Sequence, residues 1–186
     1  MSAPCLRFLM VLSIACLALP GQAVTDDEVQ VDYKDGLYVA TLHLKTPASP
    51  LIALKVLTDF EHMAEFMPGV MSSKVVSRHG NTYEVAQRGK VSFGPFSMSF
   101  ESLRRIEVID DTRILSRSIS GSAKRMQSEM KLRPQESGTQ IDYHIEIEPD
   151  SWIPSSLGSN FLQHELAEQF NALGREMLRR RGTPSP

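Results

Sequence analysis

The sequence predicts an α+β fold in which a curved antiparallel sheet of six to seven strands wraps around one long C-terminal helix. Three observations carry this prediction. Segments of alternating apolar and polar residues, separated by short polar turns, follow one another from residue 37 to residue 148. Two short helical segments interrupt the series after its first strand. An amphipathic helix ends the chain, and the concave face of the sheet is the partner available for its apolar stripe.

The N-terminal residues, 1–23, have the pattern of an export signal. Arg7 supplies a positive charge, residues 8–19 are apolar and uncharged, and Ala23 ends a stretch of small residues that suits a signal peptidase. The apolar stretch is shorter than the roughly 20 residues needed to span a bilayer. We therefore expect cleavage after Ala23 and a protein that is periplasmic or secreted. An uncleaved membrane anchor is the alternative.

Composition narrows the classes of function. Both cysteines, Cys5 and Cys16, lie in the predicted signal, so the mature chain has no thiol for a disulfide, a nucleophile or a thiolate metal site. Lys and Arg total 20 against 22 Asp and Glu, which gives no basic excess for nucleic acid. The basic run Arg179–Arg181 complements the C-terminal end of a helix dipole, and a transient membrane contact is the alternative explanation.

The first elements of the mature chain are strands and short helices. Residues 24–36 form a lead-in with room for one short strand, and 37–45 alternate as a strand. Ser49–Pro50 place an N-cap residue and a proline at the first turn of a short helix. A second short helix begins near Asp59, and Pro68–Gly69 end it.

The rest of the sheet follows as consecutive strands. Phe96, Met98 and Phe100 alternate with serines, so their side chains share one face of a strand. Met126 and Met130 share a face of a later strand in the same way. Strands joined by short polar turns are antiparallel neighbours. The predicted strands after the helices are 73–78, 82–91, 96–103, 113–119, 124–133 and 141–148.

The final helix is predicted from about residue 160 to 180. Phe161 and Phe170 belong to an apolar stripe at helical spacing, and Gly182 lies just beyond the end of the helix. One domain therefore spans residues 37–181, and residues 182–186 are a flexible tail. A curved sheet that grips one long helix is a helix-grip arrangement.

Short sequence words inside this frame resemble a known superfamily. They are TDF at 58–60, EFMPGV at 65–70 and SSKVV at 72–76. With the order of elements they are similar to the START-like superfamily, also called SRPBCC or Bet v 1-like. Within it they look like the polyketide cyclase/dehydrase and coenzyme Q-binding branch. The resemblance covers about 37–180 and implies a helix-grip fold with an apolar cavity, without specifying a ligand or a reaction.

The cavity that this resemblance implies has candidate lining residues. Methionine is flexible and adapts to apolar ligands, and Met63 and Met71 lie with other methionines where the arrangement points toward the interior or its mouth. Ordinary core packing is the alternative for any one of them. The predicted ligand-binding residues are Phe66, Met67, Phe96, Met98, Phe100, Met126, Met130, Tyr143, Phe161 and Phe170.

The mature chain has no nucleophile elbow, phosphate-binding loop or dinucleotide fingerprint. His164 opens a zincin-like word, but Glu168 stands where the second histidine is needed, so we expect no metal and no cofactor. His43 is an acid–base candidate if its strand face points inward, and a structural histidine otherwise. Four strand residues could orient a polar head group, subject to the parity of each strand: Tyr83, Gln87, Arg88 and Tyr143.

These inferences favour an exported protein that binds a hydrophobic small molecule, lipid-like or quinone-like, as a carrier or sensor rather than a catalyst. An enzyme of the polyketide cyclase/dehydratase type is the first alternative, although export separates the protein from substrates made in the cytosol. A protein-interaction module is the second alternative. The sequence leaves the oligomeric state open.

Overall fold

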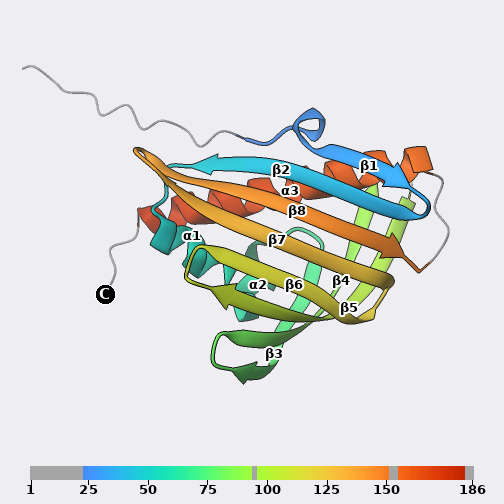
Figure 1. Ribbon diagram of the computed structural model, residues 1–186, viewed down its shortest axis with the longest axis horizontal. Coiled ribbons are helices and arrows are strands. Elements are labelled where there is room, and N and C mark those ends of the chain that lie inside the picture. Colours follow the sequence, from blue (N-terminus) through green and yellow to red (C-terminus); the bar gives the residue numbers. More distant parts are fainter. Residues whose placement is uncertain (1–22, 94–95, 151–154, 183–186) are drawn as a thin grey trace, which may run out of the picture.

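Strand pairing builds one curved antiparallel sheet in the computed structural model, which describes residues 23–93, 96–150 and 155–182 (Figure 1). The predicted export signal, apart from Ala23, and residues 183–186 of the tail lie outside the described residues. The eight strands are β1 (Gln30–Lys34), β2 (Leu37–Thr46), β3 (Val70–His79), β4 (Thr82–Phe93), β5 (Phe96–Ile109), β6 (Arg113–Gly121), β7 (Ala123–Gln135) and β8 (Gly138–Pro149).

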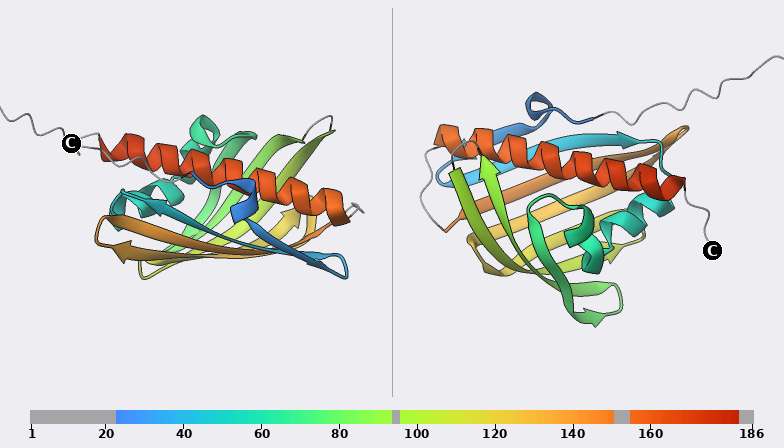
Figure 2. Two further views of the ribbon diagram at one scale, coloured as in Figure 1. Left: turned by 90° about the horizontal axis from the view of Figure 1, so that it is seen from above. Right: turned by 180° about the vertical axis from the view of Figure 1, so that it is seen from behind.

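The order of the strands is β1-β2-β8-β7-β6-β5-β4-β3, so β1 and β3 form the two edges. Strands β3 to β8 pair with their neighbours in sequence, and β2 then pairs with β8 from Tyr38↔Ile147 to Thr46↔Thr139. The turn between β1 and β2 uses a positive φ at Asp35 and at Gly36. Because the sheet twists and curls, its inner face becomes a concave surface (Figure 2).

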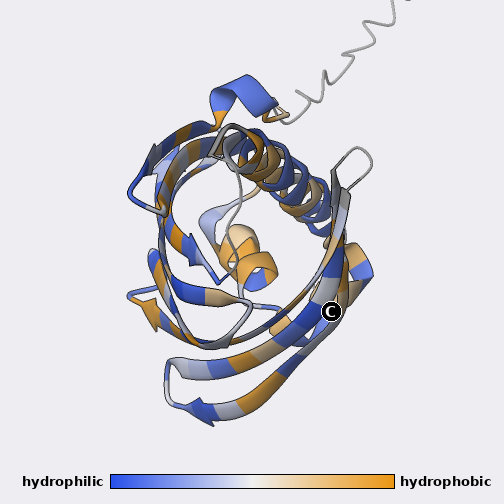
Figure 3. Ribbon diagram, turned by 90° about the vertical axis from the view of Figure 1, so that its right-hand side faces the viewer, coloured by the Kyte–Doolittle hydropathy of each residue, from blue (hydrophilic) through white to orange (hydrophobic). Residues whose placement is uncertain are grey.

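The long helix α3 (Ser155–Arg181) lies along this concave surface. Alternation along β2 places Leu42 and Leu44 on the buried inner face, opposite Tyr143 and Ile141 of β8. The stripe that α3 buries contains Leu166, Phe170, Leu173 and Met177. An end-on view shows the sheet curving around apolar helical turns (Figure 3).

Three short helical elements lie at one end of the curve: α1 (Pro50–Leu57), η2 (Phe60–His62) and α2 (Met63–Phe66). Helix α1 begins as the sequence predicts, because the Ser49 hydroxyl accepts a hydrogen bond from the Ile52 amide at 3.4 Å. The segment after α2 crosses closely over β4, where the Lys90 amide donates to the Gly69 carbonyl at 2.8 Å. A Cβ on Gly89 would lie 2.1 Å from that carbonyl oxygen, so only glycine fits there.

The N-terminal segment of the described chain is fastened to α3. The Val24 amide donates to the Asn171 side-chain oxygen at 2.8 Å, and the Asn171 side-chain nitrogen donates to the Val24 carbonyl at 2.7 Å. Val24 is buried. A 3-10 turn, η1 (Asp26–Glu28), then leads into β1.

The predicted helix-grip fold is confirmed, with three differences in its elements. The sheet has eight strands rather than six or seven, because the short N-terminal segment pairs with β2 over its whole length as β1. The second short helix is a 3-10 turn followed by the single turn of α2. Helix α3 begins at Ser155, five residues before the predicted start near residue 160.

Candidate ligand-binding cavity

A cavity of about 570 Å³ lies between the concave face of the sheet and α3. Strands β4 to β8 supply one wall, α3 the other, and residues in and after the short helices close one end. Cavities that hold small molecules in proteins range from about 300 to 1,000 Å³, so this one is large enough for an organic ligand.

Eight of the predicted residues lie together on the wall of this cavity. They come from α2's C-cap, three strands and α3, which are distant in sequence and brought together by the curvature of the sheet. Tyr143 and Phe170 touch across the sheet–helix interface, with ring centroids 4.9 Å apart. The eight residues are Met67, Met98, Phe100, Met126, Met130, Tyr143, Phe161 and Phe170.

Two predicted residues do not belong to this set. Phe66 is not among the lining residues; its ring lies 5.6 Å from the Arg180 guanidinium carbon, on the side of α2 that faces the end of α3. Helix α2 is a single turn, and Met63 and Met67 occupy its cavity side. The side chain of Phe96 lies outside the part of the chain that the structure describes.

Met71 is a further correction, because its side chain is 75% exposed rather than directed inward. The register between β3 and β4 shifts between Val70 and Ser72, which places Met71 at a β-bulge. A bulge inserts one residue and reverses the alternation of faces locally. The expectation that Met71 points toward the interior or its mouth is therefore wrong.

Among the candidate head-group residues, Gln87 and Tyr143 line the cavity and the other two do not. Tyr83 packs against Phe60, with ring centroids 5.2 Å apart, and Arg88 is exposed on the outer face of β4. His43 is not an interior acid–base residue. Its side chain is 66% exposed and pairs with the Asp142 carboxylate at 2.7 Å on the outer face of β2.

Arg104 is a charged residue on the cavity wall that was not among the predicted site residues. Arg104 follows Met98 and Phe100 on β5 with the same parity, so a charged residue in an apolar alternation was the available signal. One guanidinium nitrogen, Nη2, donates to the Gln87 side-chain oxygen. The Gln87 side-chain nitrogen donates to the Ser73 hydroxyl at 3.0 Å, which fixes the orientation of the amide.

Tyr143 completes this polar part of the wall. Burial raises the pKa of its phenol, while a hydrogen bond with Ser128 and the positive charge of Arg104 act in the opposite direction. Burial also lowers the pKa of the Arg104 guanidinium, the direction expected for a cation removed from water. An arginine nevertheless keeps its proton in proteins. The cavity wall therefore carries one fixed positive charge beside a neutral phenol and a neutral amide.

Acidic residues line the cavity at other places. Glu165 lies on the α3 wall, where burial raises the pKa of its carboxyl group and Gln169 donates a hydrogen bond to it at 2.6 Å. Glu101 and Asp150 are exposed lining residues and form part of the rim. None of these three carboxylates forms an ion pair with Arg104 in the described structure.

An ion-pair network connects the end of α3 to the short helices. Arg180 contacts the Asp59 carboxylate through Nη2 at 2.7 Å and the Glu176 carboxylate through Nε at 2.6 Å. His62 lies 2.6 Å from the same Asp59 carboxylate. These contacts fix the helical end of the cavity to α3, and we call Asp59, Glu176 and Arg180 the latch.

With this geometry in view, comparison with known proteins assigns the family. The sequence model of a family described as polyketide cyclase/dehydrase and lipid transport matches residues 46–173. The chain belongs to this family. A search of curated protein sequences found no match.

Solved structures agree with membership of this polyketide cyclase/dehydrase family. A START superfamily protein from Mycobacterium smegmatis is 12% identical with a TM-score of 0.65, over 77% of this chain and 98% of that chain. A STAR-related lipid transfer protein from Xanthomonas axonopodis is 15% identical with a TM-score of 0.63, over 82% and 99%. The Zhui aromatase/cyclase from a Streptomyces species is 13% identical with a TM-score of 0.67, over 78% and 96%. These likenesses show the START-like fold.

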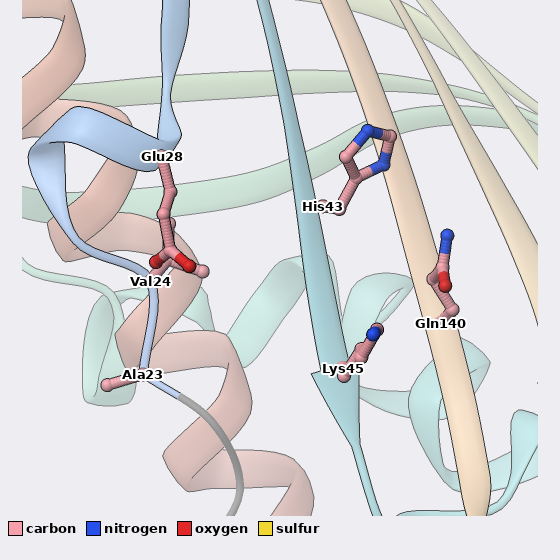
Figure 4. A pocket seen from close by; sticks show the side chains of 6 residues that line it. All are labelled: Ala23, Val24, Glu28, His43, Lys45 and Gln140. Carbon is pink, nitrogen blue, oxygen red and sulfur yellow. The ribbon is translucent and has the colours of Figure 1, made fainter.

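A smaller hollow of about 300 Å³ lies beside β2, where the N-terminal segment passes the sheet (Figure 4). His43 and Lys45 face it from the outer side of β2, and Glu28 faces it from η1. Its polar lining distinguishes it from the apolar cavity. Within the described ranges no group of three or more His, Cys, Asp or Glu side chains is placed to hold a metal ion. No helix of the described chain is both long and apolar enough to cross a membrane.

Proposed function

We propose that this protein binds a hydrophobic small molecule, lipid-like or quinone-like, in the cavity between the sheet and α3. The observation that supports the proposal is a cavity of about 570 Å³ with flexible methionines and aromatic rings on its wall. Burial of apolar ligand surface against such a wall is favourable by roughly 25 cal/mol per Å², less the cost of ordering the ligand. Methionine side chains adapt their shape to the ligand.

The proposed role is that of an exported carrier or sensor. The signal-like residues 1–23 support export to the periplasm. The mature chain contains no nucleophile elbow, phosphate-binding loop or dinucleotide fingerprint. A carrier needs a cavity that encloses its ligand and no reacting group, which agrees with a wall that is apolar over most of its area.

An enzyme of the cyclase/dehydratase type is the second candidate. Arg104 and Tyr143, close together on an otherwise apolar wall, are the observation that favours it, because a cation and a phenol could polarise a carbonyl group of a bound ring precursor. Native mass spectrometry of the purified mature protein separates the two candidates. A co-purified, chemically unchanged apolar molecule supports the carrier, and conversion of an added ring precursor supports the enzyme.

The cavity itself is tested by two matched substitutions. Met130→Glu places a carboxylate on the cavity wall, where it must be desolvated or neutralised, so uptake of an apolar fluorophore should fall at least about tenfold. Met71→Glu makes the same chemical change at the exposed bulge of β3 and should leave uptake unchanged. Fluorescence titration of both variants, after circular dichroism has confirmed folding, measures this. A folded Met130→Glu protein with normal uptake contradicts the proposed site.

A further inference from the structure

Arg104 places a permanent positive charge on the wall of a largely apolar cavity, and none of the described carboxylates pairs with it. Several cations on the latch and on the outer face of the sheet have carboxylate partners, such as Arg105 with Glu84 at 2.9 Å and Arg180 with Asp59 at 2.7 Å. The polar contact of the Arg104 guanidinium is instead the neutral oxygen of Gln87. A charge removed from water without an opposite charge is unfavourable, so the site favours an anion.

The hydrogen-bond donors of the Arg104 guanidinium also indicate that the protein leaves this group without all of its partners. A guanidinium has five N–H donors, and Gln87 accepts from one of them. Among the buried side-chain nitrogen and oxygen atoms of the described residues, only Arg104 Nε and Ser116 Oγ have no hydrogen-bond partner. Ser116 does not line the cavity, whereas Arg104 does. Buried donors in native proteins almost always have a partner, so the protein alone leaves the hydrogen-bonding capacity of the Arg104 guanidinium incompletely satisfied.

The surrounding wall constrains what that ligand looks like. Met98 and Phe100 lie further along the same strand face, and Met98 is 44% exposed at the rim. Six residues of extended strand separate Met98 from Arg104, a distance of roughly 20 Å. An elongated apolar body therefore fits between the rim and the buried charge, with its head group at the inner end.

We propose that the ligand is an amphipath whose buried end carries an ionised acidic group, a carboxylate or a phosphate ester, and that Arg104 binds this group. This inference rests on the proposed binding function and adds the chemical class of the ligand. Arginine suits the task because its planar donors match the two oxygens of a carboxylate or phosphate in a bidentate arrangement. Gln87, held by Ser73, keeps the guanidinium in place.

Four probes, each with a straight chain of twelve carbon atoms, test the inference by competition with the apolar fluorophore at neutral pH. They are dodecanoate, dodecyl phosphate, dodecanol and dodecyltrimethylammonium. The wild-type protein should bind the two anionic probes about ten- to a hundredfold more tightly than dodecanol, because hydrogen bonds to charged groups are the stronger ones. The cationic probe should bind most weakly. If dodecanoate binds more tightly than dodecyl phosphate, the ligand carries a carboxylate; the reverse order indicates a phosphate ester.

Variants of two neighbouring arginines on β5, Arg104 and Arg105, provide the matched comparison. Arg104→Gln should bind dodecanoate and dodecanol alike, and Arg104→Lys should recover part of the preference for the acid. Arg105→Gln, which changes an outward-facing arginine paired with Glu84, should keep the full preference. Denaturation curves establish that each variant is folded.

The possible results separate this inference from the proposed function. If the fluorophore enters but the wild-type protein binds dodecanol as tightly as dodecanoate, the acidic head group is wrong and the apolar cavity stands. A preference for the acid that survives in folded Arg104→Gln also overturns the inference. If neither the fluorophore nor any dodecyl probe binds, the proposed function fails and the inference fails with it.

Discussion

Phe170 is the residue through which α3 and the sheet depend on one another. It is 2% exposed, lies in the apolar stripe of α3 and packs its ring on Tyr143 of β8. Phe170→Ala should therefore lower the free energy of unfolding by roughly 3–5 kcal/mol, because it removes buried contacts and enlarges a void that the backbone cannot collapse. Urea denaturation followed by circular dichroism measures the change.

The control for this substitution is Val76→Ala, since Val76 is 54% exposed on the edge strand β3. A change within about 0.5 kcal/mol is expected there. An equal loss in both variants would mean that the ring of Phe170 contributes no more than a surface side chain. It would then contradict the packing of α3 on the sheet.

At the scale of single residues, the sequence predicts the cavity wall where alternation is unbroken. Met126 and Met130 lie as predicted because β7 keeps its register against β8 over this stretch. The expectation for Met71 is wrong because this residue lies at a β-bulge. No residue type in the sequence marks that bulge. Arg104 was missed because the predicted strand ended at residue 103, whereas β5 continues to Ile109. Only the structure could show that the Nε atom of Arg104 has no hydrogen-bond partner.

At the scale of elements, the latch fixes the helical end of the cavity to the C-terminal turn of α3. Hydrogen bonds from Arg179 chiefly, and also from Arg180, lower the pKa of the Glu176 carboxyl against the opposing effect of burial. A carboxylate with a lowered pKa stays charged in the folded protein at pH values where the unfolded chain is protonated. Its stabilising contribution is present above its ordinary pKa of about 4.3 and disappears as the pH falls through the lowered value.

Glu176→Gln should therefore cost about 1–3 kcal/mol of stability at pH 7 and much less near pH 3, where the wild-type carboxylate is itself being protonated. Urea denaturation at the two pH values measures both losses. Glu168→Gln, on an exposed position of the same helix, should change stability little at either pH. A loss for Glu176→Gln that is equal at both pH values would contradict the ionic role of the latch.

The elements themselves were predictable where local chemistry defines them. Ser49 and Pro50 mark the start of α1 in the sequence, and the structure shows the corresponding cap. The start of α3 was placed too late because residues 155–159 precede its apolar stripe and carry no periodic signal. Strand β1 was left uncertain because it is only five residues long, although its residues alternate, and its pairing with β2 defines it.

At the scale of the whole molecule, the prediction concerns export and processing. In a Gram-negative host, N-terminal sequencing of periplasmic protein should begin at Val24, and Arg7→Glu should reduce export because the signal loses its positive charge. The nitrogen of Val24 donates to Asn171 of α3, a bond that the new terminal ammonium group can also make. A periplasmic or membrane-bound protein that still begins at Met1 would contradict cleavage.

The acidic residues around the cavity have a consequence for the speed of loading rather than for its final extent. A ligand that carries a negative head group approaches Glu101 and Asp150 at the rim before it reaches Arg104. Repulsion at an exposed rim is screened by salt over a Debye length of about 8 Å at physiological ionic strength, whereas a buried contact is screened much less. If the proposed acidic ligand binds here, we expect loading to be slow in dilute surroundings and to become faster as the salt concentration rises. Small inorganic anions would meet the same repulsion and gain nothing from the apolar wall, so on this proposal we expect them to occupy the guanidinium weakly.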